Sequence, residues 1–162
     1  LNLKINMDLI LWRHAEAEVA TQELADLDRR LTAKGRKQAH KMGHWLDSKL
    51  PESCRILVSP SIRTRETVAA LERKFKIVEE LAPDASPEKL LQAANWPHSK
   101  ESVLIVGHQP SLGQAASMII TPFQPECAVR KGNVWWISQK QHQAEGLRSY
   151  LKAIITPELL SR

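Results

Sequence analysis

Residues 9–14 read Leu-Ile-Leu-Trp-Arg-His, a short apolar run that ends in an arginine and a histidine. A run of this length without helical periodicity predicts a buried strand. In α/β proteins the carboxyl ends of such strands form the sheet edge at which ligand sites lie. Arg13 and His14 therefore predict an anion site beside an imidazole. A phosphoryl group suits this pair, because a guanidinium group can hold two of its oxygens.

Two further segments end a predicted strand with a candidate site residue. A strand over residues 55–58 leads into a helix that carries Arg63. A strand over residues 102–106 leads into His108. Because parallel strands end at the same edge of a sheet, we expect His14, Arg63 and His108 to meet in one crevice.

Strands and helices alternate along most of the chain, which predicts an α/β fold. Helices are expected at residues 35–49, 59–74, 87–95 and 111–120. Their expected N-caps include Thr32, Ser86 and Ser111. Further strands are expected at residues 76–80 and, as a closing antiparallel pair, at residues 133–138 and 147–155. The predicted architecture has three layers, α/β/α, with a mostly parallel central sheet and an antiparallel edge.

The composition is typical of a globular protein with anionic partners. Hydrophobic residues make up 43%, charged residues 25%, and the net charge is +5. The length of 162 residues predicts a single domain over residues 1–162, in which residues 1–6 precede Met7 as the expected natural start. No apolar run approaches the roughly 18 residues that span a membrane, so no membrane partner is expected. Cys54 and Cys127 predict reduced thiols in a cytoplasmic protein.

The side chains of Arg13, His14, Arg63 and His108 together predict phosphoryl transfer. A neutral imidazole can take a phosphoryl group onto a ring nitrogen, and His14 is the expected nucleophile. Arg13 and Arg63 would bind the phosphoryl oxygens and disfavour a charged imidazolium nearby. His108 would donate a hydrogen bond to the phosphoryl oxygens. The second ring nitrogen of His14 is expected to donate to a backbone carbonyl, which would set its tautomer.

Four motifs, in family order, resemble those of the histidine phosphatase (phosphoglycerate-mutase-like) superfamily. Residues 13–15, Arg-His-Ala, resemble its Arg-His-Gly signature, and residues 31–39, Leu-Thr-Ala-Lys-Gly-Arg-Lys-Gln-Ala, resemble its next segment. Residues 58–67 resemble its Ser-x-x-x-Arg-Ala-x-x-Thr stretch, and residues 106–108, Val-Gly-His, resemble its last signature. The short length and the Gly-His-Gln-Pro ending are most similar to the SixA-type phosphohistidine phosphatases.

This resemblance implies a phosphoglycerate-mutase-like fold and a phosphatase that uses no metal and no cofactor. It implies that His14 becomes phosphorylated and that Arg13, Arg63 and His108 complete the phosphate pocket. The implied substrate is a phosphohistidine on another protein, above all a histidine phosphotransfer domain. Ala15 stands where the family pattern has glycine, so the backbone there is a point to examine.

The proton donor is less clearly marked. Larger members of the superfamily use a carboxylic acid to protonate an alkoxide leaving group. The candidates for this role in the present chain are Glu16, Glu80 and Asp84. An imidazole leaves more readily than an alkoxide, so a phosphohistidine substrate needs less proton assistance. The short segments also predict an open crevice that admits a folded protein.

Alternative functions stay open from the residues alone. One is a small-molecule phosphomonoesterase or mutase of the same chemistry, which would need an acid and a covered pocket. The basic balance and five tryptophans also fit a nucleic-acid-binding module, although no nucleic-acid partner is expected, and a phosphate-sensing scaffold without turnover is a third alternative. One basic cluster is interpreted as a solvated face that could instead dock an acidic protein; it comprises Arg29, Arg30, Lys34, Arg36, Lys37 and Lys41.

Overall fold

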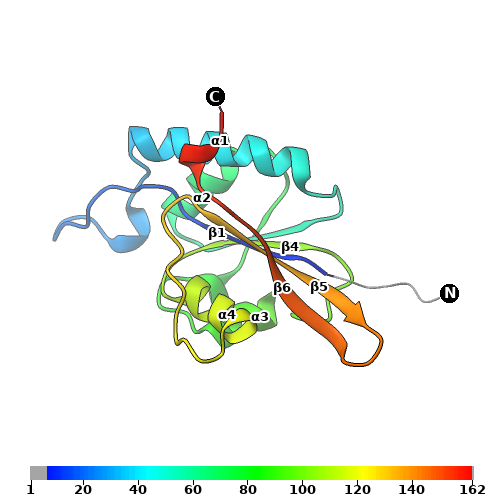
Figure 1. Cartoon of the computed structure of the whole chain (residues 1–162). Helices are drawn as coiled ribbons and strands as arrows, with labels where there is room; N and C mark the ends of the chain where they lie inside the picture. The colour runs from blue at the N-terminus through cyan, green and yellow to red at the C-terminus, as the bar shows by residue number, and fades with distance from the viewer. Residues whose placement is uncertain (1–6, 162) are drawn as a thin grey trace.

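Six strands form one sheet in residues 7–161, the part of the chain that this computed structural model describes. They are β1 (Leu9–Arg13), β2 (Arg55–Val58), β3 (Lys76–Ile77), β4 (Val103–Gly107), β5 (Val134–His142) and β6 (Gly146–Ile155). Their order is β3-β2-β4-β1-β5-β6 (Figure 1). The first four of these run parallel, and β5 and β6 each run antiparallel to their neighbours. The predicted parallel sheet with an antiparallel edge is confirmed, while the expectation for residues 1–6 lies outside the described residues.

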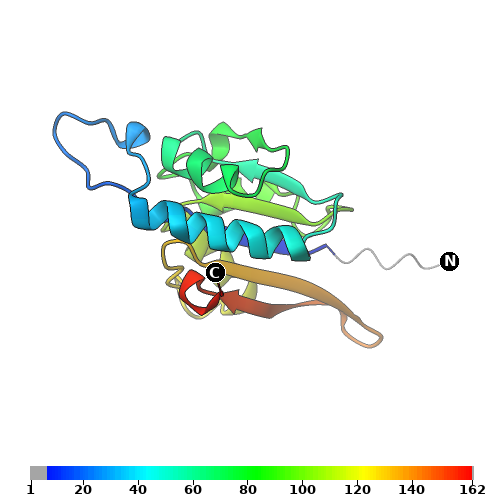
Figure 2. The same ribbon diagram turned by 90° about the horizontal axis from the view of Figure 1, so that it is seen from above.

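Four α-helices cover the two faces of the sheet in the described part of the chain. They are α1 (Ala33–Lys49), α2 (Ile62–Ala69), α3 (Pro87–Ala93) and α4 (Ser111–Ile120). Helices α1 and α2 lie on one face, and α3 and α4 lie on the other (Figure 1, Figure 2). Successive side chains of a strand point to opposite faces. Leu9 and Leu11 of β1 therefore pack beneath α3 and α4, while Ile10 and Trp12 pack beneath α1 and α2. The three-layer α/β/α prediction is confirmed.

Two of the three predicted N-caps are confirmed, and the third is wrong. The Thr32 hydroxyl accepts a hydrogen bond from the backbone N–H of Gly35, and the Ser86 hydroxyl accepts one from Lys89. Helix α4 already includes Ser111, and its cap position is Pro110. The Ser111 hydroxyl instead donates to the carbonyl of His108 at 3.1 Å, because that carbonyl lies one turn before it.

The second helix and the strand after it are shorter than expected. Helix α2 begins after Ser61, whose hydroxyl accepts from the backbone N–H of Thr64. It ends at Ala69, and Glu72 soon takes a left-handed conformation with φ of 55°, which cannot continue a helix. The expected helix through residue 74 is therefore wrong. Strand β3 likewise stops at Ile77, because Glu79–Leu81 form a turn of 3-10 helix.

No helix in residues 7–161 has the length and the apolar character needed to cross a bilayer. Cys54 and Cys127 are both buried and unpaired with one another. Burial raises the pKa of the Cys54 thiol to about 11, so it behaves as an unreactive core residue.

Helix α1 is anchored to the segment that follows β1 through Gly35. A Cβ atom on Gly35 would lie 1.9 Å from the carbonyl oxygen of Glu16. Only glycine permits this approach. The contact is reinforced by the side-chain oxygen of Gln38, which accepts from the backbone N–H of Glu16 at 3.0 Å. The start of α1 is thus held two residues along the chain from His14.

We expect Gly35→Ala to destabilise the protein by about 1–3 kcal/mol, as overpacking does. Helix propensity alone would act in the opposite direction and stabilise α1 by about 1 kcal/mol. Urea unfolding of the two proteins decides between these effects by the sign of the difference. A more stable variant would show that the close approach of Glu16 is not a constraint.

Candidate active site

The pairing of β1 with β4 brings two histidines together. In this parallel pair Arg13 lies opposite Gly107, so His14 and His108 follow paired residues at the carboxyl edge of the sheet. The backbone N–H of His14 donates to the carbonyl of Gly107 at 3.1 Å. The two rings consequently lie with their centroids 5.3 Å apart and their planes tilted by 55°.

The first turn of α2 adds Arg63 to this pair. Its Nη2 lies 3.2 Å from Nδ1 of His108, and its side chain is only 3% exposed. Arg13 lies directly before His14, and its Nη1 donates to the carbonyl of Val129 at 2.9 Å. The structure thus brings Arg13, His14, Arg63 and His108 to one place at the sheet edge, as the strand ends predict.

The tautomer of His14 follows from its hydrogen bond. Nδ1 lies 2.8 Å from the carbonyl oxygen of Ala15, and a carbonyl only accepts. The neutral ring therefore carries its proton on Nδ1 and has its lone pair on Nε2. This is the form that can attack a phosphoryl group, and it agrees with the predicted bond to a backbone carbonyl.

The tautomer of His108 is fixed in the opposite sense. A guanidinium group only donates, so Arg63 donates to Nδ1 of His108. The proton of the neutral ring lies on Nε2, which donates to the Ser59 hydroxyl at 2.7 Å. In this arrangement the ring N–H of His108 is directed to Ser59. Donation to a phosphoryl oxygen, as expected from the sequence, requires a proton on Nδ1.

The two arginines retain buried N–H groups without a protein partner. Nε of Arg13 and Nε of Arg63 are inaccessible and make no hydrogen bond within the described residues. A buried donor without an acceptor costs about 1–3 kcal/mol, and more when it is charged. Both N–H groups are therefore unsatisfied donors beside the two imidazoles.

Burial keeps both histidines neutral. Desolvation lowers the pKa of His14 to about 3; its hydrogen bond to Ala15 opposes this shift, and the charges of Arg63 and Arg13 add to it. Desolvation followed by the charge of Arg63 lowers the pKa of His108 to about 3. Both rings therefore stay uncharged throughout the physiological pH range.

This shift predicts a pH-dependent stability. The unfolded chain binds a proton on each histidine below pH 6.5, whereas the folded protein does so only near pH 3, so acid favours unfolding between these values. Each histidine lowers the free energy of unfolding by about 1.4 kcal/mol per pH unit in this window. We expect the loss measured by urea unfolding between pH 7 and pH 5 to be smaller in His14→Gln by up to about 2 kcal/mol. Equal losses would contradict a neutral His14.

Hydroxyl groups connect α2 to the segment after β1. Thr67 Oγ1 accepts from the backbone N–H of Ala15 at 3.1 Å and donates to the carbonyl of Arg63 at 2.7 Å. The non-glycine residues with positive φ in the described chain do not include Ala15. The backbone there accommodates any residue, so the missing family glycine is no obstacle.

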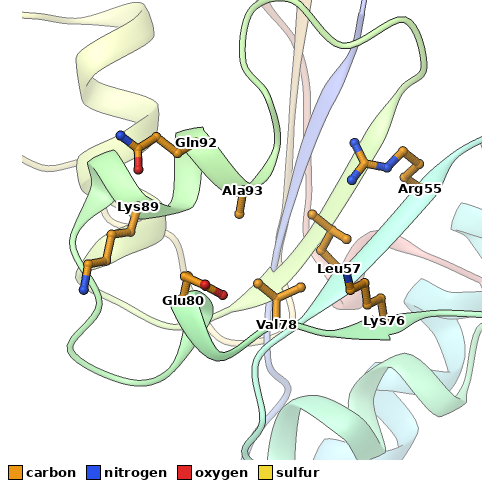
Figure 3. Close-up of a pocket in the computed structure, with 8 residues that line it drawn as sticks. All are labelled: Arg55, Leu57, Lys76, Val78, Glu80, Lys89, Gln92 and Ala93. Atoms are coloured by element: carbon orange, nitrogen blue, oxygen red, sulfur yellow. The ribbon is translucent and has the colours of Figure 1, made fainter.

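Within residues 7–161, the three proton-donor candidates make no hydrogen bond or ion pair with the four site residues. The Glu16 carboxylate accepts from the Thr32 hydroxyl at 2.8 Å and lies 3.5 Å from Lys34, at the start of α1. Glu80 lines a separate cavity of about 320 Å³ between α3 and the β2–β3 edge (Figure 3). Asp84 lies in the loop that follows, with φ of 71°. None of the four site residues lines the cavity that holds Glu80.

Asp26 is the carboxylate that the structure brings to the site, and the sequence analysis missed it. Arg63 Nη1 donates to the backbone carbonyl of Asp26 at 2.7 Å, and Nη2 donates to its carboxylate at 3.0 Å. The second carboxylate oxygen accepts from Arg29. Asp26 lies in an exposed excursion between β1 and α1, seen projecting in Figure 2. In the sequence, only Arg29 three residues later marks Asp26 as a member of an ion pair. Nothing local indicates its contact with Arg63.

Asp26 occupies one side of the Arg63 guanidinium and does not use Nε. Burial opposes the ionisation of Asp26, but hydrogen bonds from Arg29 and Arg63 outweigh it and lower the pKa of this carboxyl. Asp26 is therefore a carboxylate at neutral pH. It holds Arg63 by Nη1 and Nη2, whereas Nε of Arg63 makes no hydrogen bond among the described residues.

We expect Asp26→Asn to lower kcat/KM by about tenfold and to weaken inhibition by inorganic phosphate, because Arg63 loses a charged hydrogen bond that orients it. Steady-state assays with phosphate as a competitive inhibitor measure both effects. The opposite result, tighter phosphate inhibition, would mean that the Asp26 carboxylate competes with phosphate for Arg63.

Among residues 7–161, no three His, Cys, Asp or Glu side chains are grouped as metal ligands. Two arginines and two neutral histidines at the carboxyl edge of a parallel sheet define a phosphoryl-transfer enzyme of the α/β class.

Comparison with known proteins assigns the family. The model of the histidine phosphatase superfamily (branch 1) matches residues 9–85. A phosphohistidine phosphatase SixA homolog of Haemophilus influenzae is 35% identical over an alignment of 123 positions that covers 67% of this chain and 74% of that protein. Phosphohistidine phosphatase SixA of Escherichia coli is 29% identical over an alignment of 115 positions that covers 66% of this chain and 70% of that protein.

The fold agrees with these relatives. A crystal structure assigned as phosphohistidine phosphatase SixA from Agrobacterium tumefaciens superposes with a TM-score of 0.76 at 22% identity, covering 93% of this chain and 98% of that chain. The chain belongs to the histidine phosphatase superfamily, branch 1, and it is a phosphatase of the SixA type. The resemblance inferred from the four motifs is confirmed.

Proposed function

We propose that this protein is a phosphohistidine phosphatase that removes the phosphoryl group from a histidine of another protein through a phosphohistidine on His14. The observation that carries the proposal is the His14 ring. Its Nδ1–H is bound to the Ala15 carbonyl, so the lone pair on Nε2 is free beside Arg63 and His108. The SixA-type relatives support the choice of substrate.

The reaction proceeds in two displacements. Nε2 of His14 attacks phosphorus, a P–N bond to His14 forms, and the P–N bond to the substrate imidazole breaks. The departing imidazole leaves as a neutral ring if its other nitrogen carries a proton, which solvent can supply. Water then attacks phosphorus, the P–N bond to His14 breaks, and its electron pair returns to Nε2. Inorganic phosphate leaves, a proton of the attacking water passes to phosphate or solvent, and His14 is neutral again.

Arg13 and Arg63 act on charge in both steps. Both guanidinium groups lie close enough to His14 for their charges to lower its pKa. Their fixed charges stabilise negative charge that spreads over those oxygens in the transition state. His108 packs against His14 and accepts a hydrogen bond from Arg63 at Nδ1, so it positions Arg63 beside the His14 ring.

The expected partner is a phosphorylated protein, with a histidine phosphotransfer domain as the specific candidate. The cytoplasm is the expected compartment, consistent with two buried free thiols. A phosphomonoesterase remains the second candidate because Asp26 lies at Arg63. The lowered pKa of Asp26 disfavours it as an acid for an alkoxide, which supports the phosphohistidine substrate.

The test is phosphate release from a histidine phosphotransfer domain carrying phosphohistidine, with p-nitrophenyl phosphate assayed in parallel. We expect turnover of the phosphoprotein and a loss of at least about 1,000-fold in His14→Ala, because the nucleophile is gone. Rapid acid-free quenching should trap phosphate on His14 in the wild type alone.

His98→Ala is the matched control, since His98 is an exposed histidine outside the site. It should retain full activity. Turnover of the ester alone would retain the chemistry but replace the substrate class with phosphomonoesters. Undiminished activity in His14→Ala would overturn the nucleophile.

A further inference from the structure

The exposed face of α1 forms one wall of a basic groove. The groove has a volume of about 1050 Å³, and the C-terminal segment at Pro157 and Glu158 lines its other side. The side chains of α1 that line it include Lys34, Arg36, Lys37, His40, Lys41 and His44. Four of these are cations, and residues 33–46 contain no acid, while the whole chain has a net charge of +5. Most of the net charge therefore lies on this one helix face.

The stability of α1 does not account for this charge. The amino end of a helix carries a partial positive charge, so acidic residues stabilise the first turn and basic residues destabilise it. The first turn of α1 has no acidic residue, and Lys34, Arg36 and Lys37 lie within its first two turns. Among the described residues Lys34 pairs with Glu16, whereas Lys37 and Lys41 have no ion-pair partner. These cations therefore destabilise the amino end of α1 while they make its exposed face positive.

The groove begins beside the active site. The close contact of Gly35 with the carbonyl of Glu16 and the hydrogen bond from Glu16 to Gln38 tie the start of α1 to the chain just after His14. A histidine side chain is short. A folded protein that places its phosphohistidine at His14 must therefore lay the surrounding surface across the mouth of the site, next to α1.

We propose that this groove docks an acidic surface that flanks the phosphohistidine of the substrate protein. The inference rests on the proposed function and names the surface that selects the substrate. Charge complementarity of this kind raises the rate of association and orients the partner, and it acts on KM more than on the chemical step. No Phe, Tyr or Trp lines the groove, so it lacks the stacking platform expected for a single-stranded nucleic acid.

The experiment reverses two charges that take no part in the pocket, Lys37→Glu and Lys41→Glu together. With a phosphorylated histidine phosphotransfer domain of acidic surface, we expect kcat/KM to fall by about tenfold or more at about 0.05 M salt, through KM. The loss should shrink at about 0.5 M salt, where exposed charges are screened. Hydrolysis of free phosphohistidine should change by less than about twofold, since a small substrate does not reach the groove.

The matched control carries the same change in net charge at the opposite edge of the sheet. Lys100 and Lys140 are exposed; Lys100 precedes β4, and Lys140 lies beyond the residues of β5 that pair with the amino end of β1. Lys100→Glu with Lys140→Glu should leave kcat/KM for the phosphoprotein unchanged.

The outcomes separate this inference from the proposed function. An equal loss in the control variant, or no loss in the α1 variant, would overturn the docking surface while turnover of the phosphoprotein upheld the proposed function. A reversal that abolishes binding of an oligonucleotide but not of the phosphoprotein would assign the groove to nucleic acid and overturn the inference. A wild-type protein that turns over free phosphohistidine but no phosphoprotein would overturn the docking surface and restrict the proposed function to small substrates.

Discussion

The register between β1 and β4 is the constraint on which the site depends. It places Arg13 opposite Gly107, and the next residues, His14 and His108, leave the sheet together. Both strands are buried on both faces, so a slip of one residue would turn Ile10 and Trp12 to the wrong side of the sheet. The spacing of the two imidazoles is thus set by the hydrophobic core rather than by contacts between the rings.

Burial of this sheet edge also constrains the charges of the site residues. Two arginines lie beside two imidazoles that desolvation holds in the neutral form. His14 uses one ring nitrogen in a protein hydrogen bond, to the Ala15 carbonyl. His108 uses both, since it donates to the Ser59 hydroxyl and accepts from Arg63. Asp26 supplies the carboxylate that pairs with Arg63. The same contacts therefore set the tautomers of the two histidines, their charge and the orientation of Arg63.

Electrostatic interactions act in two different ways around this site. Inside the pocket, hydrogen-bond geometry decides the outcome, because donors such as Nε of Arg63 are buried and salt does not screen them. Along α1, exposed cations act over about a Debye length of 10 Å and depend on ionic strength. The anchoring of α1 at Gly35 joins the two, so the basic face of α1 and the residues around His14 keep a fixed position relative to one another.

The sequence by itself determined the order of the strands along the chain and, to within one residue, the carboxyl ends of β2 and β4, although not those of β3 and β5. Apolar runs are a clear sequence signal, and a residue that directly follows a buried strand has little freedom, so the positions of His14 and His108 were predictable. Arg63 was predictable because it lies in the first turn of the helix that follows β2. The length of α2 and the role of Ser111 were predicted wrongly, because capping depends on which backbone groups lie within reach. Only the tertiary structure decided which carboxylate lies at the site. Asp26 lies in a polar loop without periodicity, and its partner Arg63 is 37 residues away, so their contact exists only once the loop folds back over the sheet edge.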